Sequence, residues 1–276
     1  MSADEDKGAP APILKTGIWY QAGSYRVRSL VPNVSIAPSL DLPVVAYKKY
    51  ESDFCGSEGP IRETPEGRWA RSRGWRVDDQ GTFGPLTVVS VLRRYDYQAQ
   101  FCGQVDGRII LFDHGKPIAS VHVGDADDEG QVDGLGVRAN GALRLTNMWF
   151  KPFGDLFVEG RDIEVRPLPR SDSICDGAAT LPNVFGKPIA QARSILGRSG
   201  WKADPQPPPV VTKNPDGSLE FENSDDYNMY NRGFKEEKNC DPRGFCEFHY
   251  KRGEIKVMLY TQGEEVVQHY EECQTK

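Results

Sequence analysis

The chain of 276 residues is long enough for one or two domains, each with a core of its own. Its net charge of −6 is mild, and basic residues are interspersed with acidic ones. Because no basic stripe is present, we do not expect a nucleic-acid partner. The apolar runs are too short to span a bilayer as a helix.

Residues 1–13 are polar, acidic and proline-containing, which predicts a disordered leader. From 14 to 170, short β-like runs alternate with Gly, Pro and Asp turns, and almost no helical periodicity occurs. The predicted strands and hairpins are 17–28, 42–50, 85–92, 108–112 with 118–123, 136–139 with 142–146, and 156–159 with 162–166. Asn140-Gly141 is a strong two-residue hairpin signal. We therefore expect a mainly β domain over 14–170, a sandwich or barrel of short antiparallel strands.

A proline-containing polar stretch, 167–173, predicts a linker, and residues 171–276 predict a small α+β domain. Within it, 181–201 combines an extended run, a helix and a helix stop. Pro188 suits the first turn, and Gly200 suits a left-handed cap before Trp201. The apolar stripe of this helix consists of Ile189, Ala192, Ile195 and Leu196. A short helix over 225–232 and three strands, 244–251, 254–261 and 265–270, are expected to follow.

The segment 181–201 resembles the opening of a PASTA repeat, in which a strand end, a glycine and a short helix lead to a glycine and a bulky residue. The matching residues are Pro182, Val184, Gly186, Ala192, Leu196 and Gly200. The resemblance implies a PASTA-like α+β domain and, as a function, peptidoglycan binding. Gly74-Trp75 in the first half repeats the Gly200-Trp201 pair, and we interpret that similarity as chance because no apolar helix stripe precedes Gly74.

Six cysteines are present, none in a Cys-x-x-Cys pair. The histidines are too scattered to complete a zinc site, so three disulfides in an oxidising compartment are expected. We therefore expect a periplasmic protein whose export signal has been removed ahead of Met1, with the acidic leader as the tether of a lipoprotein. The alternative is a cytosolic protein with six free thiols.

The second half also resembles small periplasmic bacterial domains, in which a Gly-Trp helix end precedes a Cys-x5-Cys segment and a strand ending near Thr-x-Gly-Glu. The residues that carry this resemblance are Trp201, Gly233, Cys240, Cys246, Thr261, Gly263 and Glu264. It implies the pairings Cys240–Cys246, Cys175–Cys273 and, within the first domain, Cys55–Cys102. The sequence alone leaves fifteen connectivities open.

Few residues point to catalysis. No Gly-x-Ser-x-Gly elbow occurs. His114 is predicted in a turn and His122 in a strand, and neither has a nucleophile beside it in the sequence. The acidic segment 125–133 has oxygen ligands at alternate positions and a glycine at the sixth, as in a calcium loop, but Gly136 stands where the bidentate glutamate belongs. We therefore expect no metal and no cofactor, and keep calcium as an alternative.

As a whole, the chain resembles a bacterial periplasmic lipoprotein of the toxin-immunity type. That resemblance implies a non-enzymatic protein that neutralises a secreted toxin by direct binding. The expected partner-binding residues are Asp125, Asp127, Asp128, Glu129, Asp225, Asp226, Tyr227 and Tyr230. The alternatives are a peptidoglycan-binding module of the cell envelope and a hydrolase with an unrecognised site.

Overall fold

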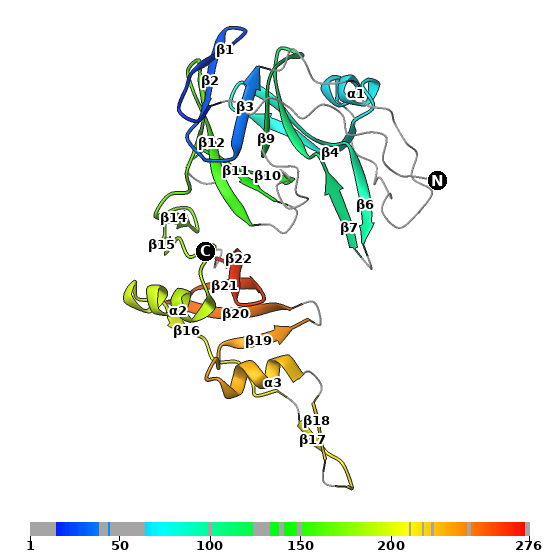
Figure 1. Cartoon of the computed structure of the whole chain (residues 1–276). Coiled ribbons are helices and arrows are strands. Elements are labelled where there is room, and N and C mark those ends of the chain that lie inside the picture. The colour runs from blue at the N-terminus through cyan, green and yellow to red at the C-terminus, as the bar shows by residue number, and fades with distance from the viewer. Residues whose placement is uncertain are drawn as a thin grey trace, which may run out of the picture. The chain divides into compact units, whose positions relative to one another are not determined.

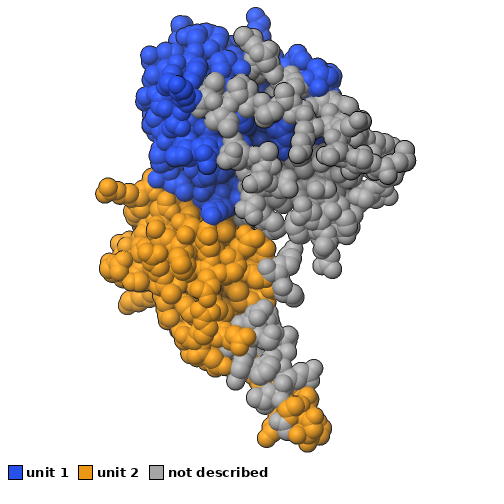
Figure 2. Space-filling model, viewed as in Figure 1, with its two compact units in different colours: residues 1–168 blue, residues 169–276 orange. Residues whose placement is uncertain are grey.

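A computed structural model describes residues 15–38, 44, 64–98, 101–123, 133–137, 141–147, 151–209, 211–216, 218–221, 224–241 and 244–273. The protein is mainly β, with several antiparallel sheets. It divides into two compact units, residues 1–168 and 169–276 (Figure 2). Residues 171–173 of the predicted linker lie in a strand of the second unit rather than in a connecting segment.

Unit 1 contains a six-stranded sheet in the order β1-β2-β13-β12-β11-β10 (Figure 1). Its strands are β1 Tyr20–Ala22, β2 Tyr25–Ser29, β10 Asp133–Val137, β11 Leu143–Thr146, β12 Pro152–Glu159 and β13 Asp162–Arg166. All neighbours are antiparallel except β2 and β13. The hairpins predicted at Gly23 and Gly160 are therefore present, and each glycine has a positive φ that its turn requires.

A second sheet of unit 1 has five strands in the order β3-β9-β8-β5-β4. These are β3 Val34–Pro38, β4 Arg76–Phe83, β5 Leu86–Leu92, β8 Arg108–Asp113 and β9 Lys116–Val123; β6 Arg94–Gln98 and β7 Phe101–Val105 form a separate hairpin. Alternate residues from both sheets, among them Val27, Ile36, Leu111 and Val165, form one buried cluster. The alternation of apolar and polar residues in the sequence thus places every second side chain in a core that the two sheets share.

Helix α1 (Pro65–Ser72) contacts β4 and β5, and the sequence patterns did not indicate it. Thr64 caps its first turn by accepting a hydrogen bond from the Gly67 backbone N–H, and Pro65 occupies the first helical turn. The helix has a weak apolar stripe because Ala70 and the partly buried Trp69 supply most of its contact with the sheet. Short capped helices of this kind lack the repeated apolar spacing that identifies longer ones.

Unit 2 is built on a five-stranded sheet in the order β16-β20-β21-β22, with β19 also paired to β20. The strands are β16 Lys202–Ala203, β19 Glu237–Cys240, β20 Phe245–Arg252, β21 Ile255–Gln262 and β22 Glu265–Glu272. Two small hairpins, β14 Ser171–Ile174 with β15 Ala179–Pro182 and β17 Val211–Lys213 with β18 Leu219–Phe221, complete the β structure. The three C-terminal strands expected from the sequence are confirmed.

Helices α2 (Ile189–Arg198) and α3 (Ser224–Asn231) contribute to the core of unit 2. Ile189, Ala192 and Leu196 of α2 are fully buried with Phe248 and Leu259 of the sheet. Pro188 is the N-cap residue rather than part of the first turn, and α3 stops before Gly233, whose φ is 93°. The apolar stripe of 181–201 therefore packs as its spacing predicts.

Both helix-Gly-Trp segments end in the same local structure, a common helix cap, so their similarity is local and gives no evidence of an internal repeat. Gly74 and Gly200 have φ of 85° and 83°, and each is followed by a buried tryptophan. The Trp75 N–H donates to the Ala70 carbonyl and the Trp201 N–H donates to the Leu196 carbonyl. These are the hydrogen bonds of a Schellman cap, which favours a glycine followed by an apolar residue.

Candidate functional site

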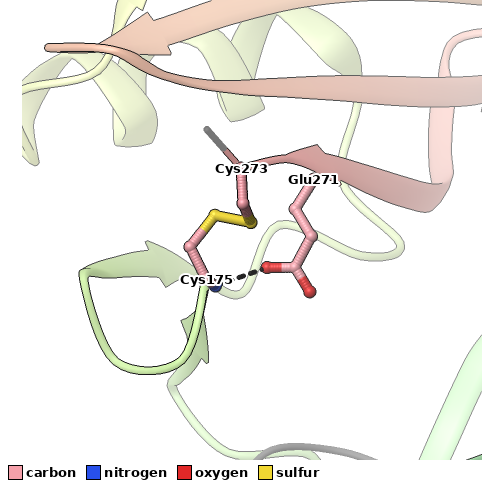
Figure 3. Close-up of side chains that lie close together, drawn as sticks. All are labelled: Cys175, Glu271 and Cys273. Atoms are coloured by element: carbon pink, nitrogen blue, oxygen red, sulfur yellow. Dashed lines mark hydrogen bonds between the residues drawn. A yellow bond between two sulfur atoms is a disulfide. The ribbon is translucent and has the colours of Figure 1, made fainter. Parts of the chain in front are cut away.

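Two of the three expected disulfides are present among the described residues, and both lie in unit 2. Cys175 and Cys273 join the first hairpin of the unit to the end of β22, and the Cys175 N–H donates to Glu271 Oε2 over 2.9 Å (Figure 3). Cys240 and Cys246 face one another on β19 and β20. The remaining pairing stays a prediction, because Cys55 and the side chain of Cys102 lie outside the described residues.

The residues expected to bind a partner are only partly described. Asp125, Asp127, Asp128 and Glu129 lie outside the described residues, as does most of the calcium-like segment. Asp225 and Tyr227 lie on α3, but their side chains are outside the description as well.

Two of the expected residues, Asp226 and Tyr230, have intramolecular roles. Asp226 Oδ1 accepts a hydrogen bond of 2.5 Å from the Cys240 N–H, which ties α3 to β19. The Lys235 ammonium lies 3.2 Å from the centre of the Tyr230 ring, and its Nζ donates to the Tyr230 carbonyl. Both contacts stay within one short stretch of unit 2.

The Asp226 carboxylate belongs to a buried cluster with Glu237 and Cys240. One donor atom from each residue lies within 4.8 Å of the others, and Glu237 is only 3% exposed. Burial, followed by the charge of Asp226, raises the pKa of Glu237 to about 8. The pair therefore holds a proton at neutral pH, since two adjacent buried carboxylates do not both ionise. The sequence showed the acidic residues but not their approach, which depends on the packing of α3 on β19.

The neighbouring residue, Glu236, is fully buried in a separate network. Tyr250 donates a hydrogen bond of 3.1 Å to Glu236 Oε1, and the Arg193 Nε lies 3.1 Å from the same oxygen. Burial, and then the negative charge of Glu236, raises the pKa of Tyr250. This network links α2 to the sheet, so we interpret it as structural.

The side of the unit 2 sheet opposite the core carries an aromatic and polar surface. We call Glu247, Met258, Tyr260, Gln268 and Tyr270 the outer face. The first three alternate with buried residues on β20 and β21, and the last two lie opposite Tyr260 and Met258 on β22. The rings of Tyr260 and Tyr270 meet edge to face at 5.4 Å, and Tyr270 is 49% exposed. Tyr260 donates to Glu247 over 2.9 Å, and the Gln268 amide donates to the Tyr270 hydroxyl over 2.7 Å. Burial, with Glu247, raises the pKa of Tyr260 to about 12, so both tyrosines are oriented by polar partners.

The histidines of unit 1 occupy the predicted turn and strand. His114 has a positive φ and an exposed side chain, with Nδ1 2.6 Å from Asp113 Oδ1. His122 is buried on β9, directly opposite Ser35, and its ring nitrogens form no hydrogen bond with any described residue. Burial, and then the charge of Arg108, lowers the pKa of His122 to about 4. His122 is thus neutral and not hydrogen-bonded to a serine or cysteine in the described part of the chain.

Two clusters in the described ranges have the composition of metal sites, and both lie in unit 2. They are Cys175 with Glu271 and Cys273, and Asp226 with Glu237 and Cys240. Each sulfur in these clusters belongs to a disulfide. A disulfide sulfur is a poor metal ligand, because metal binding uses the thiolate. The chemistry available in the oxidised protein is therefore that of paired carboxyl groups.

No protein-family model, curated protein or solved structure matches this chain. None of the helices in the described ranges is long and apolar enough to cross a membrane.

Proposed function

We propose that this chain is a non-enzymatic, exported binding protein that neutralises a secreted bacterial toxin by direct contact. The observation that carries the proposal is the outer face of unit 2, where two oriented tyrosines and a methionine occupy the side of a sheet opposite its core. Tyrosine is enriched among the residues that dominate binding energy at protein interfaces. The disulfides favour an oxidising compartment such as the periplasm, and thereby a role outside the cytoplasm.

The outer face suits a protein partner. Tyr260 and Tyr270 supply apolar area at a low entropic cost, because their polar contacts already restrain them. Glu247 lies within this surface, Glu271 and Glu272 end β22, and the whole chain has a net charge of −6. Lys256 lies opposite Glu272 and balances part of this charge, so the attraction to a basic toxin comes from the net charge of the whole chain, which favours fast association. The expected contacts at Asp125, Asp127, Asp128 and Glu129 add to this charge and remain predictions.

The experiment is to titrate the purified full chain with a secreted toxin encoded beside its gene, measuring affinity by calorimetry and toxin activity in parallel. Tyr260→Ala and Tyr270→Ala should each weaken binding about 30-fold if each is a hot spot worth about 2 kcal/mol. The matched control is Arg26→Ser with Asp162→Ser, an exposed ion pair on the sheet of unit 1. Absence of binding by the wild-type chain, or equal loss in the control, would refute the proposal.

A second candidate function is peptidoglycan binding, favoured by the local structure of 181–201. In that segment Gly186 and Gly200 have positive φ on either side of α2, and Val184 is buried. Retention of the chain on purified peptidoglycan, without any protein partner, would support this function over toxin neutralisation.

A further inference from the structure

The buried cluster on α3, β19 and β20 places four potential metal ligands together. Asp226 and Glu237 provide carboxylate oxygens that lie within 4.8 Å of each other and of Cys240 Sγ. Cys246 pairs directly with Cys240 across the two strands, with 4.0 Å between their Cα atoms. The fourth donor, Cys246 Sγ, is thus bonded to the third. Three separate elements converge on this point, and the strand pairing holds two of them in register.

Burial distinguishes this cluster from ordinary surface acids. Glu237 is 3% exposed, Cys240 1% and Cys246 6%. In the described part of the chain, Glu237 forms no ion pair with a lysine, arginine or histidine, in contrast to Glu236, which meets Arg193. A buried carboxylate normally has a cationic partner or a metal, because its desolvation is costly. Glu237 is instead hydrogen-bonded to the Asp226 carboxyl group, so a cation that enters here takes the place of the proton between them.

We propose that reduction of the Cys240–Cys246 disulfide converts this cluster into a zinc site with two thiolate and two carboxylate ligands. Zinc accepts sulfur and carboxylate ligands in tetrahedral geometry. Two thiolates on one such ion lie about 3.7 Å apart, given a Zn–S distance of about 2.3 Å. Residues paired directly across two strands can place their sulfur atoms at that separation by rotation of the side chains.

A dithiol can serve as the reductant for this conversion. The dithiol gives two electrons and two protons to the Cys240–Cys246 bond and becomes a disulfide itself. Zinc then binds the two sulfur atoms as thiolates and releases their two protons, together with the proton held by the Asp226–Glu237 pair, so that both carboxylates complete the coordination. The proposal goes beyond toxin neutralisation and does not depend on it, since any newly made chain is reduced before its disulfides form.

The test uses the full chain, reduced with a phosphine and titrated with Co²⁺ and then Zn²⁺ against a chromophoric competitor. One equivalent of Co²⁺ should give sulfur-to-cobalt charge transfer and the intense visible bands of four-coordinate cobalt. The oxidised chain should bind at least 100-fold more weakly. Cys240→Ser with Cys246→Ser should abolish the charge-transfer band, and Glu237→Gln should weaken Zn²⁺ binding at least tenfold.

Two controls separate this cluster from other thiols. Cys175→Ser with Cys273→Ser, and Cys55→Ser with Cys102→Ser, should each retain the cobalt spectrum at one equivalent. An unfolded reduced chain would bind metal through thiols alone, so circular dichroism is recorded on every sample. Equal affinity of Glu237→Gln and wild type, or a spectrum that survives Cys240→Ser with Cys246→Ser, would overturn the proposal.

Discussion

The two units cover their sheets in different ways. In unit 1, two sheets pack against one shared apolar core, and the opposite side of the six-stranded sheet carries paired charges: Arg26 with Asp162, Arg28 and Arg166 with Glu164, and Arg144 with the buried Asp155. In unit 2, helices α2 and α3 join the core on one side of a single sheet. Its other side carries the two tyrosines of the outer face rather than a set of ion pairs.

This difference is why we propose the outer face of unit 2 as the binding surface. On the sheet of unit 1, Asp155 and Glu164 are buried and already paired with arginine, so their charges are satisfied within the unit. An aromatic surface gains free energy when it is covered. Unit 2 is also the smaller unit, and small domains bury a smaller share of their surface. Both described disulfides lie there, where covalent links compensate for a limited core.

The largest expected effect is the loss of the long-range disulfide of unit 2. Cys175→Ser with Cys273→Ser opens a loop with a sequence separation of 98 residues, against 6 for Cys240–Cys246. The chain-entropy relation predicts a loss of about 4.7 kcal/mol for a loop of about 100 residues and about 2 kcal/mol for the short one. Urea unfolding, followed by hydrogen exchange on peptides of unit 2, measures both. A larger loss for the short loop would contradict the entropic account.

The next effect concerns the second apolar cluster of unit 1. Trp75 is fully buried beneath α1, and Trp75→Ala should destabilise unit 1 by about 4 kcal/mol through the cavity it leaves. Hydrogen exchange should accelerate in peptides of unit 1 and stay unchanged in those of unit 2. Trp69→Ala, at a partly buried position, is the control with a smaller loss. Equal acceleration in both units would mean that they unfold together.

The next effect is the pH dependence that His122 gives to unit 1. The pKa of His122 is lowered from 6.5 to about 4 in the folded state, so the unfolded chain binds the proton first. Neutral His122 therefore makes its full contribution to the free energy of unfolding above pH 6.5. This contribution falls by about 3 kcal/mol as the pH decreases toward 4. His122→Leu should reduce this loss, measured by urea unfolding at pH 7 and pH 4.5. His114→Gln, at an exposed turn, is the control expected to retain it.

The smallest effect tests the helix end in unit 2. Gly200→Ala should cost about 1 kcal/mol, because φ is 83° although the space around a Cβ is ordinary. Gly197→Ala, one turn earlier inside α2 with open space around it, should instead stabilise the unit by about 0.5–1 kcal/mol. Thermal unfolding measures the change in Tm for each variant. Changes of the same sign would show that backbone strain at Gly200 does not determine the effect of the substitution.

Elements with a clear local signal were predicted from the sequence. The C-terminal strands and α2 follow from apolar spacing and from glycines that stop them, and the hairpins of unit 1 follow from their turns. Helix α1 was missed because its evidence is a cap, Thr64-Pro65, and not a stripe. The C-terminal end of α1 could have been predicted, because Gly74-Trp75 is the same Schellman pattern that ends α2.

Less of the candidate site could be predicted from the sequence. The expected partner contact of Asp226 stays a prediction, and the sequence did not indicate that its carboxylate accepts a hydrogen bond from the Cys240 N–H. The outer face was also missed, because Tyr260 and Tyr270 come together only through the register of β21 and β22. Side-chain alternation along one strand is visible in a sequence, but the residue opposite it on the next strand is not.

The sequence left the cysteine pairings of unit 2 open among fifteen connectivities, but by itself it determined the mainly β character, most strand positions and the stripe of α2. These depend on spacing along the chain and on the backbone preferences of glycine and proline. Only the tertiary structure decided that Glu236 has an arginine partner while Glu237 meets Asp226 and the disulfide. Neighbouring residues of an extended chain point in opposite directions, so their surroundings depend on segments far away in the sequence.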